Sequence, residues 1–409
     1  MAINFKNPLP KTAQVAETES AESMQEPEQA ASSKPAQKAG PQKKPLVAAM
    51  EAKGELAAIM KQLVKEKGEG VLIKGSLVPM VQRIPTGLFE FDLATGGGFP
   101  MSRLSIIYGP ESSGKSNICY LAVASAQQLP APCNKVVWVD LEGTFDPKWV
   151  KQFGVDVDEL VVVKPGYGEE AVDIIDAVVR AEDVALVVVD SIAVLTSAKE
   201  AEQSTEKFDV GTASVLVKRL SNKLAIAFSL EGRRGHTPAV IFVNQTRFKI
   251  GVMFGDPETM PGGQTMKFLS SMTVRLYGKN KIVKEIHPEL PAFKETVAVI
   301  KKAKVPINAS SFKYDMAMMP TDVLKVGESD SWGIVAGHLR AHNLLGKADK
   351  GGGWQLEVSP GKKIDYGTLI QIQDHYQTDP QFQKEMKSLV ISLVSQSAFL
   401  VEAEGLAAK

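Results

Sequence analysis

The sequence has little of what secreted, membrane-spanning or zinc-binding proteins require. Only two cysteines, Cys119 and Cys133, occur in 409 residues, which excludes a disulfide framework and a four-ligand cysteine site for zinc. The five histidines do not pair at metal-ligand spacing. No apolar run approaches the ~20 residues that cross a bilayer, and no signal peptide is evident. We therefore expect a cytoplasmic protein without zinc and without a membrane partner.

A net charge is also missing, because 47 basic residues balance 47 acidic ones. This balance argues against a generally basic protein that adheres to any polyanion. If the chain binds nucleic acid, its positive charge must be concentrated locally or gathered by the assembly of many copies.

The first 46 residues are nearly free of large apolar side chains, so we expect a disordered N-terminal extension over residues 1–46. Residues 47–80 differ and are expected to form an oligomerisation helix and strand. The strand signal lies at 71–80, and before it apolar residues recur at helical spacing, namely Leu56, Ile59, Met60, Leu63 and Val64. This stripe packs either on the chain's own core or on a neighbouring subunit.

Residues 81–326 alternate apolar runs with helical stretches. Nearly continuous apolar runs are typical of parallel strands that are buried on both faces. Five such runs are present, with the sequences LSIIYG, KVVWVD, LVVVK, VALVVVD and AVIFVN. They predict an α/β core with a mostly parallel central sheet. Residues 327–409 are more polar, and we expect a small helical or mixed C-terminal domain there.

The segment GPESSGKS, residues 109–116, lies between a predicted strand and a predicted helix. In this pattern the glycines Gly109 and Gly114 allow backbone N–H groups to surround phosphates. Lys115 reaches the terminal phosphates, and the hydroxyl of Ser116 is a ligand for Mg²⁺. The segment therefore predicts a nucleotide-binding P-loop.

Polar residues follow the neighbouring strands at the edge where a bound nucleotide would lie. Asp190, with Ser191 beside it, is placed to hold Mg²⁺ through water, and Glu142 is our candidate general base for the attacking water. Asn244 and Gln245 end a third strand and could sense a γ-phosphate, although an ordinary turn would use the same residues. Two further residues follow Glu142 closely: Asp146, and Trp149, which stacks on adenine or belongs to the core.

The order and spacing of GPESSGKS, VDLEGTFDP, VVVDSIAVLT and NQTRFKIGVMFGDPETMPGG resemble the RecA family of ATP-dependent DNA recombinases, of bacterial type or encoded by a phage. The resemblance implies a RecA-like P-loop ATPase core, an N-terminal polymerisation arm over the helix and strand before it, and a small C-terminal domain. It also implies ATP and Mg²⁺ as cofactors.

Several site residues are implied by position in that family. Glu142 matches the catalytic glutamate, and Gln245 matches the glutamine that couples the γ-phosphate to a DNA-binding loop. Lys302 and Lys304 resemble a lysine pair that reaches the ATP of the adjacent subunit. Lys267 and Phe268 resemble interface residues. The implied nucleotide site comprises Gly109, Pro110, Glu111, Ser112, Ser113, Gly114, Lys115, Ser116, Asn117, Asp146, Trp149, Asp190 and Ser191, with Ser116 and Asp190 at the metal.

The resemblance also implies two DNA-binding loops, at about 200–211 and 247–268. The second would use Arg247, Lys249, Ile250, Gly251, Val252, Met253, Glu258, Gly262, Gly263 and Gln264. The first would use Val210, Gly211, Lys218 and Arg219. The chain departs from the family where Val215 replaces an arginine and Pro261 replaces a threonine, and it lacks a strongly acidic C-terminal tail.

The expected function is ATP-dependent filament formation on single-stranded DNA, followed by homologous pairing and strand exchange with double-stranded DNA. The expected partners are DNA, further copies of the chain, and single-strand-binding and mediator proteins. One alternative is a hexameric helicase or branch-migration ATPase on the same core. Another is a filament whose nucleotide-bound form mainly recruits a second protein.

Overall fold

The computed structural model describes residues 55–68, 80–195, 212–234, 237–248, 258–261, 263–348 and 352–407. The chain divides into two compact units, residues 1–51 and 52–409, and every described residue belongs to the second. Among the described helices, none combines the length and the apolar composition that a membrane span requires.

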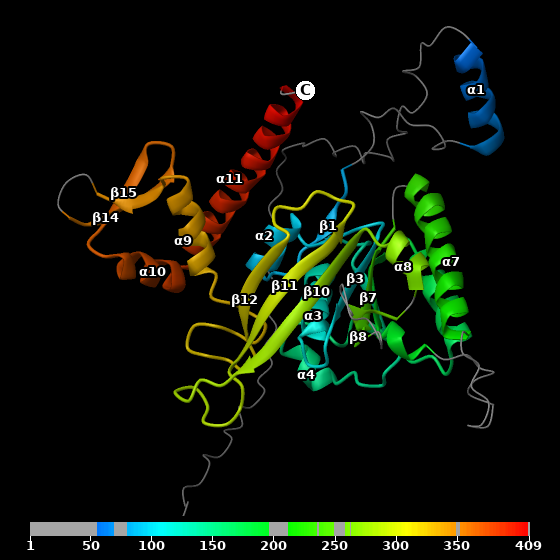
Figure 1. Cartoon of the computed structure of the whole chain (residues 1–409), viewed down its shortest axis with the longest axis horizontal. Helices are drawn as coiled ribbons and strands as arrows, with labels where there is room; N and C mark the ends of the chain where they lie inside the picture. Colours follow the sequence, from blue (N-terminus) through cyan, green and yellow to red (C-terminus); the bar gives the residue numbers. More distant parts are fainter. Residues whose placement is uncertain are drawn as a thin grey trace, which may run out of the picture. The chain divides into compact units, whose positions relative to one another are not determined.

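An eight-stranded sheet forms the core, in the order β12-β11-β10-β3-β7-β6-β4-β5 (Figure 1). The strands β10, β3, β7, β6, β4 and β5 are mutually parallel, while β11 and β12 run antiparallel to their neighbours. The five apolar runs therefore form parallel strands as predicted. Their bounds are β3 (Leu104–Gly109), β4 (Lys135–Asp140), β5 (Leu160–Val163), β6 (Val184–Asp190) and β7 (Ala239–Gln245).

Helices cover both faces of the parallel part of the sheet. Alternate side chains of β4 show this arrangement, because Trp138 joins the cluster around α3 (Lys115–Gln127), whereas Val137 joins the cluster of α5 (Gly168–Val179) and α7 (Thr212–Arg234). Every residue of β6 is buried. A sheet that is covered on both faces leaves only its strand ends for chemistry, which is why the polar residues lie there.

The antiparallel extension of the sheet consists of β10 (Met272–Lys281), β11 (Phe293–Ala303) and β12 (Ser311–Ala317). Side chains of β11 alternate between buried and half-buried positions from residue 293 to residue 300. The buried set faces the same cluster as α3, since Ala298 and Ile300 belong to it. Four short elements lie around this core, namely β1 (Arg83–Ile84), α2 (Phe89–Thr95), β2 (Phe99–Pro100) and α4 (Pro147–Lys151).

The C-terminal part has its own apolar cluster, which includes Trp332, Tyr376 and Met386 and also takes in Phe89 of α2. It contains a three-stranded antiparallel sheet as well as helices, so the mixed form of the prediction applies. Its elements are α9 (Trp332–Ala341), β13 (Leu345–Lys347), β14 (Trp354–Ser359), β15 (Lys362–Tyr366), α10 (Leu369–Thr378) and α11 (Pro380–Ala407).

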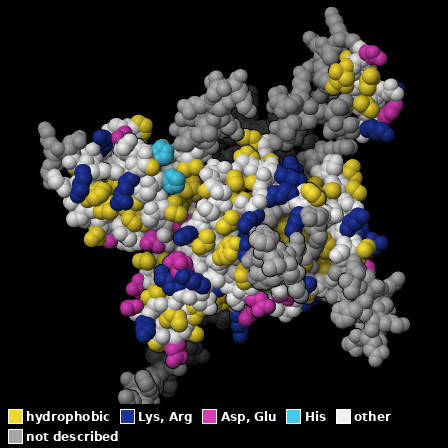
Figure 2. Space-filling model, viewed as in Figure 1, with side chains coloured by type: hydrophobic (Ala, Val, Ile, Leu, Met, Phe, Trp, Pro, Cys, Tyr) yellow, Lys and Arg dark blue, Asp and Glu magenta, His cyan; other side chains and the backbone are white. Residues whose placement is uncertain are grey.

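The predicted N-terminal helix is present as α1 (Glu55–Lys67). None of its side chains is buried, and Leu56 is 67% exposed. Figure 2 shows its hydrophobic side chains open at the surface among charged ones. The strand predicted at 71–80 lies outside the described residues, apart from Met80.

Candidate functional site

The P-loop connects β3 to α3 and begins the candidate site. Gly114 occupies the N-cap position of α3 with φ of 90°, so the helix has no side-chain cap, and Ser112 has φ of 56°. Successive turns of this kind direct backbone N–H groups into a concave loop that suits an anion at a helix N-terminus. The ammonium of Lys115 donates to the carbonyls of Gly109 (3.2 Å) and Pro110 (2.7 Å) and thus lies inside the loop.

The loop rests on β10 at very close range. A Cβ atom at Gly278 would lie 2.5 Å from the carbonyl oxygen of Ser113, so only glycine allows this approach. The hydroxyl of Ser113 is buried without a hydrogen-bond partner. Burial lowers the pKa of Lys115, while the nearby carboxylates of Asp190 and Glu142 act in the opposite direction. A rigid loop around a buried cation is an arrangement that fits a polyphosphate.

Ser116 and Asp190 meet at the carboxyl edge of the sheet. The Ser116 hydroxyl donates to Asp190 Oδ2 at 2.7 Å. Burial raises the pKa of Asp190 to about 6, the hydrogen bond from Ser116 opposes this rise, and the charge of Glu142 adds to it. One carboxylate, one hydroxyl and the phosphates of a nucleotide are the oxygen ligands that Mg²⁺ takes in such sites. The pair therefore fits Mg²⁺ that arrives with a nucleotide.

Glu142, Ser191 and Gln245 are brought together from three strand ends. The Ser191 hydroxyl donates to Glu142 Oε1, and Gln245 Nε2 donates to the same oxygen at 3.2 Å. Glu142 is exposed at this edge. A carboxylate that is held by two donors on one oxygen keeps its other oxygen for a water molecule.

Asp140 supports this arrangement, although the sequence, which offers Asp140, Glu142 and Asp146 after this strand, favours Glu142 as the candidate base. Its carboxylate, 3% exposed, accepts hydrogen bonds from the backbone N–H groups of Gly143 (2.9 Å), Thr144 (3.2 Å) and Phe145 (3.3 Å). It therefore fixes the turn that carries Glu142. The sequence signal was the acid at the strand end, which marks Asp140 and Glu142 equally.

A hairpin begins two residues after Gln245. β8 (Arg247–Phe248) pairs with β9 (Glu258–Thr259), and α8 (Gly263–Leu269) follows. Asn244 Nδ2 donates to the carbonyl of Pro261 at 2.9 Å and so ties the strand end to the far side of the hairpin. The range 247–268 predicted as a loop therefore contains paired strands and a helix at its two ends.

Lys302 and Lys304 lie far from this network. Both ammonium groups donate to backbone carbonyls at the C-terminus of α8, Lys302 to Lys267 and Phe268, and Lys304 to Phe268. Partial burial lowers the pKa of Lys302, and the charge of Lys304 acts in the same direction. Two cations at a helix C-terminus complement its dipole. Lys302 pairs with Thr273 on β10, and Thr273 in turn pairs near the start of β3. Because the P-loop follows the carboxyl end of β3, the P-loop and the lysine pair lie at opposite ends of the strands, which we call the two edges of the sheet.

The remaining predicted residues have varied positions. Asp146 caps α4 by accepting from Lys148 N–H (2.9 Å), and Trp149 is half-buried with its ring edge-to-face on Phe153. Lys218 and Arg219 are exposed on α7. For Glu258, Gly263 and Gln264 only the backbone is described. Outside the described residues lie Val210, Gly211, Lys249, Ile250, Gly251, Val252, Met253 and Gly262.

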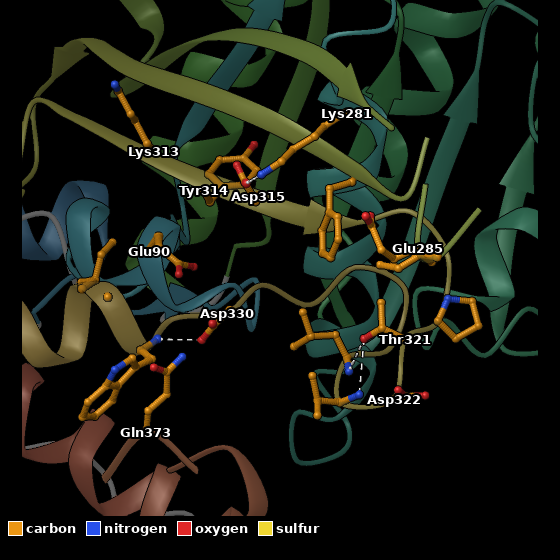
Figure 3. A pocket seen from close by; sticks show the side chains of 18 residues that line it. Glu90, Lys281, Glu285, Lys313, Tyr314, Asp315, Thr321, Asp322, Asp330 and Gln373 are labelled. Atoms are coloured by element: carbon orange, nitrogen blue, oxygen red, sulfur yellow. Dashed lines mark hydrogen bonds and ion pairs between the residues drawn. The ribbon is translucent and has the colours of Figure 1, made fainter. Parts of the chain in front are cut away.

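A cavity of about 1180 Å³ lies elsewhere, beside β12 and the start of α9 (Figure 3). Its polar lining is largely paired internally. Lys281 forms an ion pair with Asp315 (2.8 Å), Thr321 Oγ1 accepts from the backbone N–H of Leu324 (2.9 Å), and Asp330 accepts from that of Trp332 (3.0 Å). No P-loop residue lines it, so it is separate from the candidate nucleotide site.

Comparison with known families agrees with the geometry. A family model described as RecA N-terminal domain matches residues 54–318, which is more than half of the chain. The matched region contains the P-loop, the Glu142–Gln245 network, the hairpin and the lysine pair. The chain therefore belongs to the RecA family.

Proposed function

We propose that this protein is an ATP-dependent DNA recombinase that polymerises on single-stranded DNA and catalyses homologous pairing and strand exchange. Family membership indicates a RecA-type recombinase that binds ATP and DNA in general terms. The observation that carries the proposal is the hydrogen bond from Gln245 to Glu142. It joins the candidate general base to the residue that leads into the hairpin.

The P-loop and its neighbours have distinct roles in the proposed hydrolysis. Lys115 and the backbone N–H groups of residues 112–116 hold the phosphates of ATP. Ser116 and Asp190 would hold Mg²⁺, which would supply positive charge beside the phosphates. Glu142 orients a water molecule and accepts its proton as the water oxygen attacks the terminal phosphorus, while the bond from this phosphorus to the bridging oxygen breaks and ADP leaves.

Lys302 and Lys304 complete the site of another protomer. Lys302 lies eight residues beyond the P-loop end of β11, a separation of about 27 Å at the rise of an extended strand. Neither lysine of a protomer can therefore reach the nucleotide held by its own P-loop. A head-to-tail assembly would bring the lysine pair of one protomer to the phosphates of the next. Stabilisation of transition-state charge in trans is worth about 10³–10⁵ in rate in other nucleotide hydrolases.

DNA binding is coupled to the nucleotide through the hairpin. When ATP occupies the site, Gln245 gives up its hydrogen bond to Glu142 and donates to the γ-phosphate instead. This change moves the start of β8. Arg247, which is exposed, and the predicted residues that follow it then meet the DNA backbone and bases. Hydrolysis restores the Gln245–Glu142 contact and releases the DNA.

ATP hydrolysis measured with and without single-stranded DNA tests this function. We expect strong stimulation by DNA, and we expect Gln245→Ala to abolish the stimulation while nucleotide binding persists. Equal rates with and without DNA would show that the proposed coupling is wrong. Electron microscopy of the ATP-bound assembly distinguishes a recombinase from the alternative. Open helices would indicate a recombinase, and closed rings would indicate a helicase or branch-migration motor.

A further inference from the structure

A buried lysine lies against the outside of the P-loop. Lys294, near the start of β11, is 6% exposed and occupies the buried face of the strand, two residues before Thr296. An ammonium in such a place is costly unless hydrogen bonds and an opposite charge compensate for it. Its surroundings therefore indicate what it does.

The ammonium has two hydrogen-bond acceptors. Lys294 Nζ donates to the carbonyl of Ser112 at 2.6 Å and to Asn280 Oδ1 at 2.7 Å, and Asn280 is directly opposite it on β10. Within the described part of the chain, no carboxylate lies within ion-pair distance of it. Burial lowers the pKa of Lys294, and no nearby charge opposes that effect. The positive charge of Lys294 is thus solvated by dipoles but not neutralised.

The contact with Ser112 orients the loop. In a trans peptide the carbonyl of Ser112 and the N–H of Ser113 point in opposite directions. Because the carbonyl is held by Lys294 outside the loop, the N–H points inward, where its bond to the Pro110 carbonyl is long at 3.4 Å. The stem of Lys294 also covers the loop, since its Cδ lies 3.0 Å from the position of a Cβ at Gly114.

We propose that Lys294 is a positioning residue of the phosphate site, which aims the Ser113 N–H at a nucleotide polyphosphate and adds a second positive charge behind the loop. This proposal rests on the proposed nucleotide-binding function. The polyphosphate supplies the negative charge that the surroundings of Lys294 lack, so nucleotide binding and the protonation of Lys294 favour each other.

Other charged groups are arranged differently. On the loop itself, Lys115 bonds to the carbonyls of Gly109 and Pro110, and Glu111 is exposed. On β12 the residue paired with Lys294 is Met316, which is uncharged. Strand alternation places Lys279, Glu295, Lys281 and Asp315 on the opposite face, where they pair as Lys279–Glu295 (3.3 Å) and Lys281–Asp315 (2.8 Å). Arg275, which stacks on Tyr277, and Lys313 lie on that face as well.

Binding of a fluorescent Mg–ADP analogue to the full chain, without DNA, tests the proposal. Lys294→Met keeps the stem and removes the charge, and we expect it to weaken binding about tenfold. In the wild type, binding of Mg–ADP should weaken as the pH rises into the range where Lys294, whose pKa is lowered by burial, loses its proton. Neither variant should show the loss of affinity that comes from deprotonation of Lys294, because arginine stays charged and methionine does not titrate. Lys294→Arg should bind Mg–ADP more tightly than Lys294→Met, since it keeps the positive charge.

The matched control is Lys279→Met, one position before Asn280 on the exposed face, which should bind like the wild type at every pH. Thermal unfolding checks that each variant is folded. Lys294→Met with the affinity and pH profile of the wild type would overturn the proposal, and so would a loss of affinity at an unchanged pH profile, which indicates a structural anchor only. Failure of the wild type to bind Mg–ADP would instead overturn the proposed function.

Discussion

The two edges of the central sheet contrast in what they hold. At the carboxyl edge, the P-loop, Ser116, Asp190, Glu142 and Gln245 lie together and are joined by hydrogen bonds from Ser116 to Asp190 and from Gln245 to Glu142. At the other edge, Lys302 and Lys304 donate to the backbone carbonyls that end α8. One edge has the polar groups that are proposed to surround a nucleotide, and the other holds cations whose expected ligand belongs to another molecule.

This difference between the two edges suggests that different protomers supply the groups for nucleotide binding and for turnover. The residues proposed to hold the nucleotide lie within one protomer, whereas the lysines expected to stabilise its reaction lie about 27 Å away along β11. α8 joins the two edges, because it begins after the hairpin and ends under the lysine pair. We therefore expect nucleotide binding to need one protomer and hydrolysis to need two.

The largest effect is expected at the lysine edge. Lys302→Ala combined with Lys304→Ala should lower the DNA-stimulated turnover number by about 10³ or more. Binding of Mg–ADP by the free protomer should not change, because neither lysine lies in its own site. Lys301→Ala, which removes a positive charge from the exposed residue next to Lys302, is the control for a general effect of charge. If the double variant also lost nucleotide binding, the lysine pair would contribute to the site of its own protomer, and the proposed division between binding and turnover would be wrong.

Glu142→Gln should have the next largest effect, at the carboxyl edge. Removal of a general base lowers turnover by about 10²–10⁴, while the amide still accepts the hydrogen bond from Ser191. Nucleotide binding should remain, and filaments should persist on DNA because ATP is not consumed. Single-turnover hydrolysis measures this, with exposed Glu182→Gln as the control. If the variant recruits a partner protein as well as the wild type does, the non-enzymatic alternative gains support.

Gly278→Ala tests how rigidly β10 holds the P-loop. The added methyl group would lie 2.5 Å from the Ser113 carbonyl, so the loop must move. We expect binding of Mg–ADP to weaken about tenfold, with thermal stability lowered by less than the 2–5 kcal/mol of a core truncation. Gly337→Ala in α9, where a methyl group meets nothing within 4 Å, should leave nucleotide affinity unchanged. Unaltered binding by Gly278→Ala would show that the loop does not need this support.

The smallest effect on the protomer is expected at Phe268. Its side chain is 70% exposed beside the lysine pair, so Phe268→Ala should leave the melting temperature of the protomer nearly unchanged. Assembly should nevertheless weaken, as sedimentation with ATP and DNA would show. Ile370→Ala, 66% exposed in α10, is the matched control and should affect neither. Equal assembly by both variants would argue against an interface at this edge.

The sheet could be predicted from sequence because its strands are buried on both faces. Runs such as VALVVVD contain no polar alternation, so their type and approximate bounds follow directly. The P-loop, Asp190 and Glu142 could be predicted for a related reason, since chemistry at such a sheet is confined to strand ends.

Lys294 and Asp140 could not be assigned in the same way. In β11 both faces carry apolar and polar residues, and the sequence does not say that the face with Lys294 is the buried one. The role of Asp140 depends on backbone N–H groups that come together only when residues 141–145 form their turn. The pairing of β8 with β9 could not be predicted because each strand has two residues, too few for a period to appear.

Mixing of two inactive variants tests the central claim most directly. Glu142→Gln lacks the base of its own site, and the Lys302→Ala, Lys304→Ala variant lacks the groups it lends to its neighbour. If the site is shared, equal mixtures on single-stranded DNA should recover ATP hydrolysis, up to about a quarter of the wild-type rate for random assembly in a head-to-tail filament. A mixture that hydrolyses ATP no faster than the mean of the two variants assayed separately would contradict a site built from two protomers.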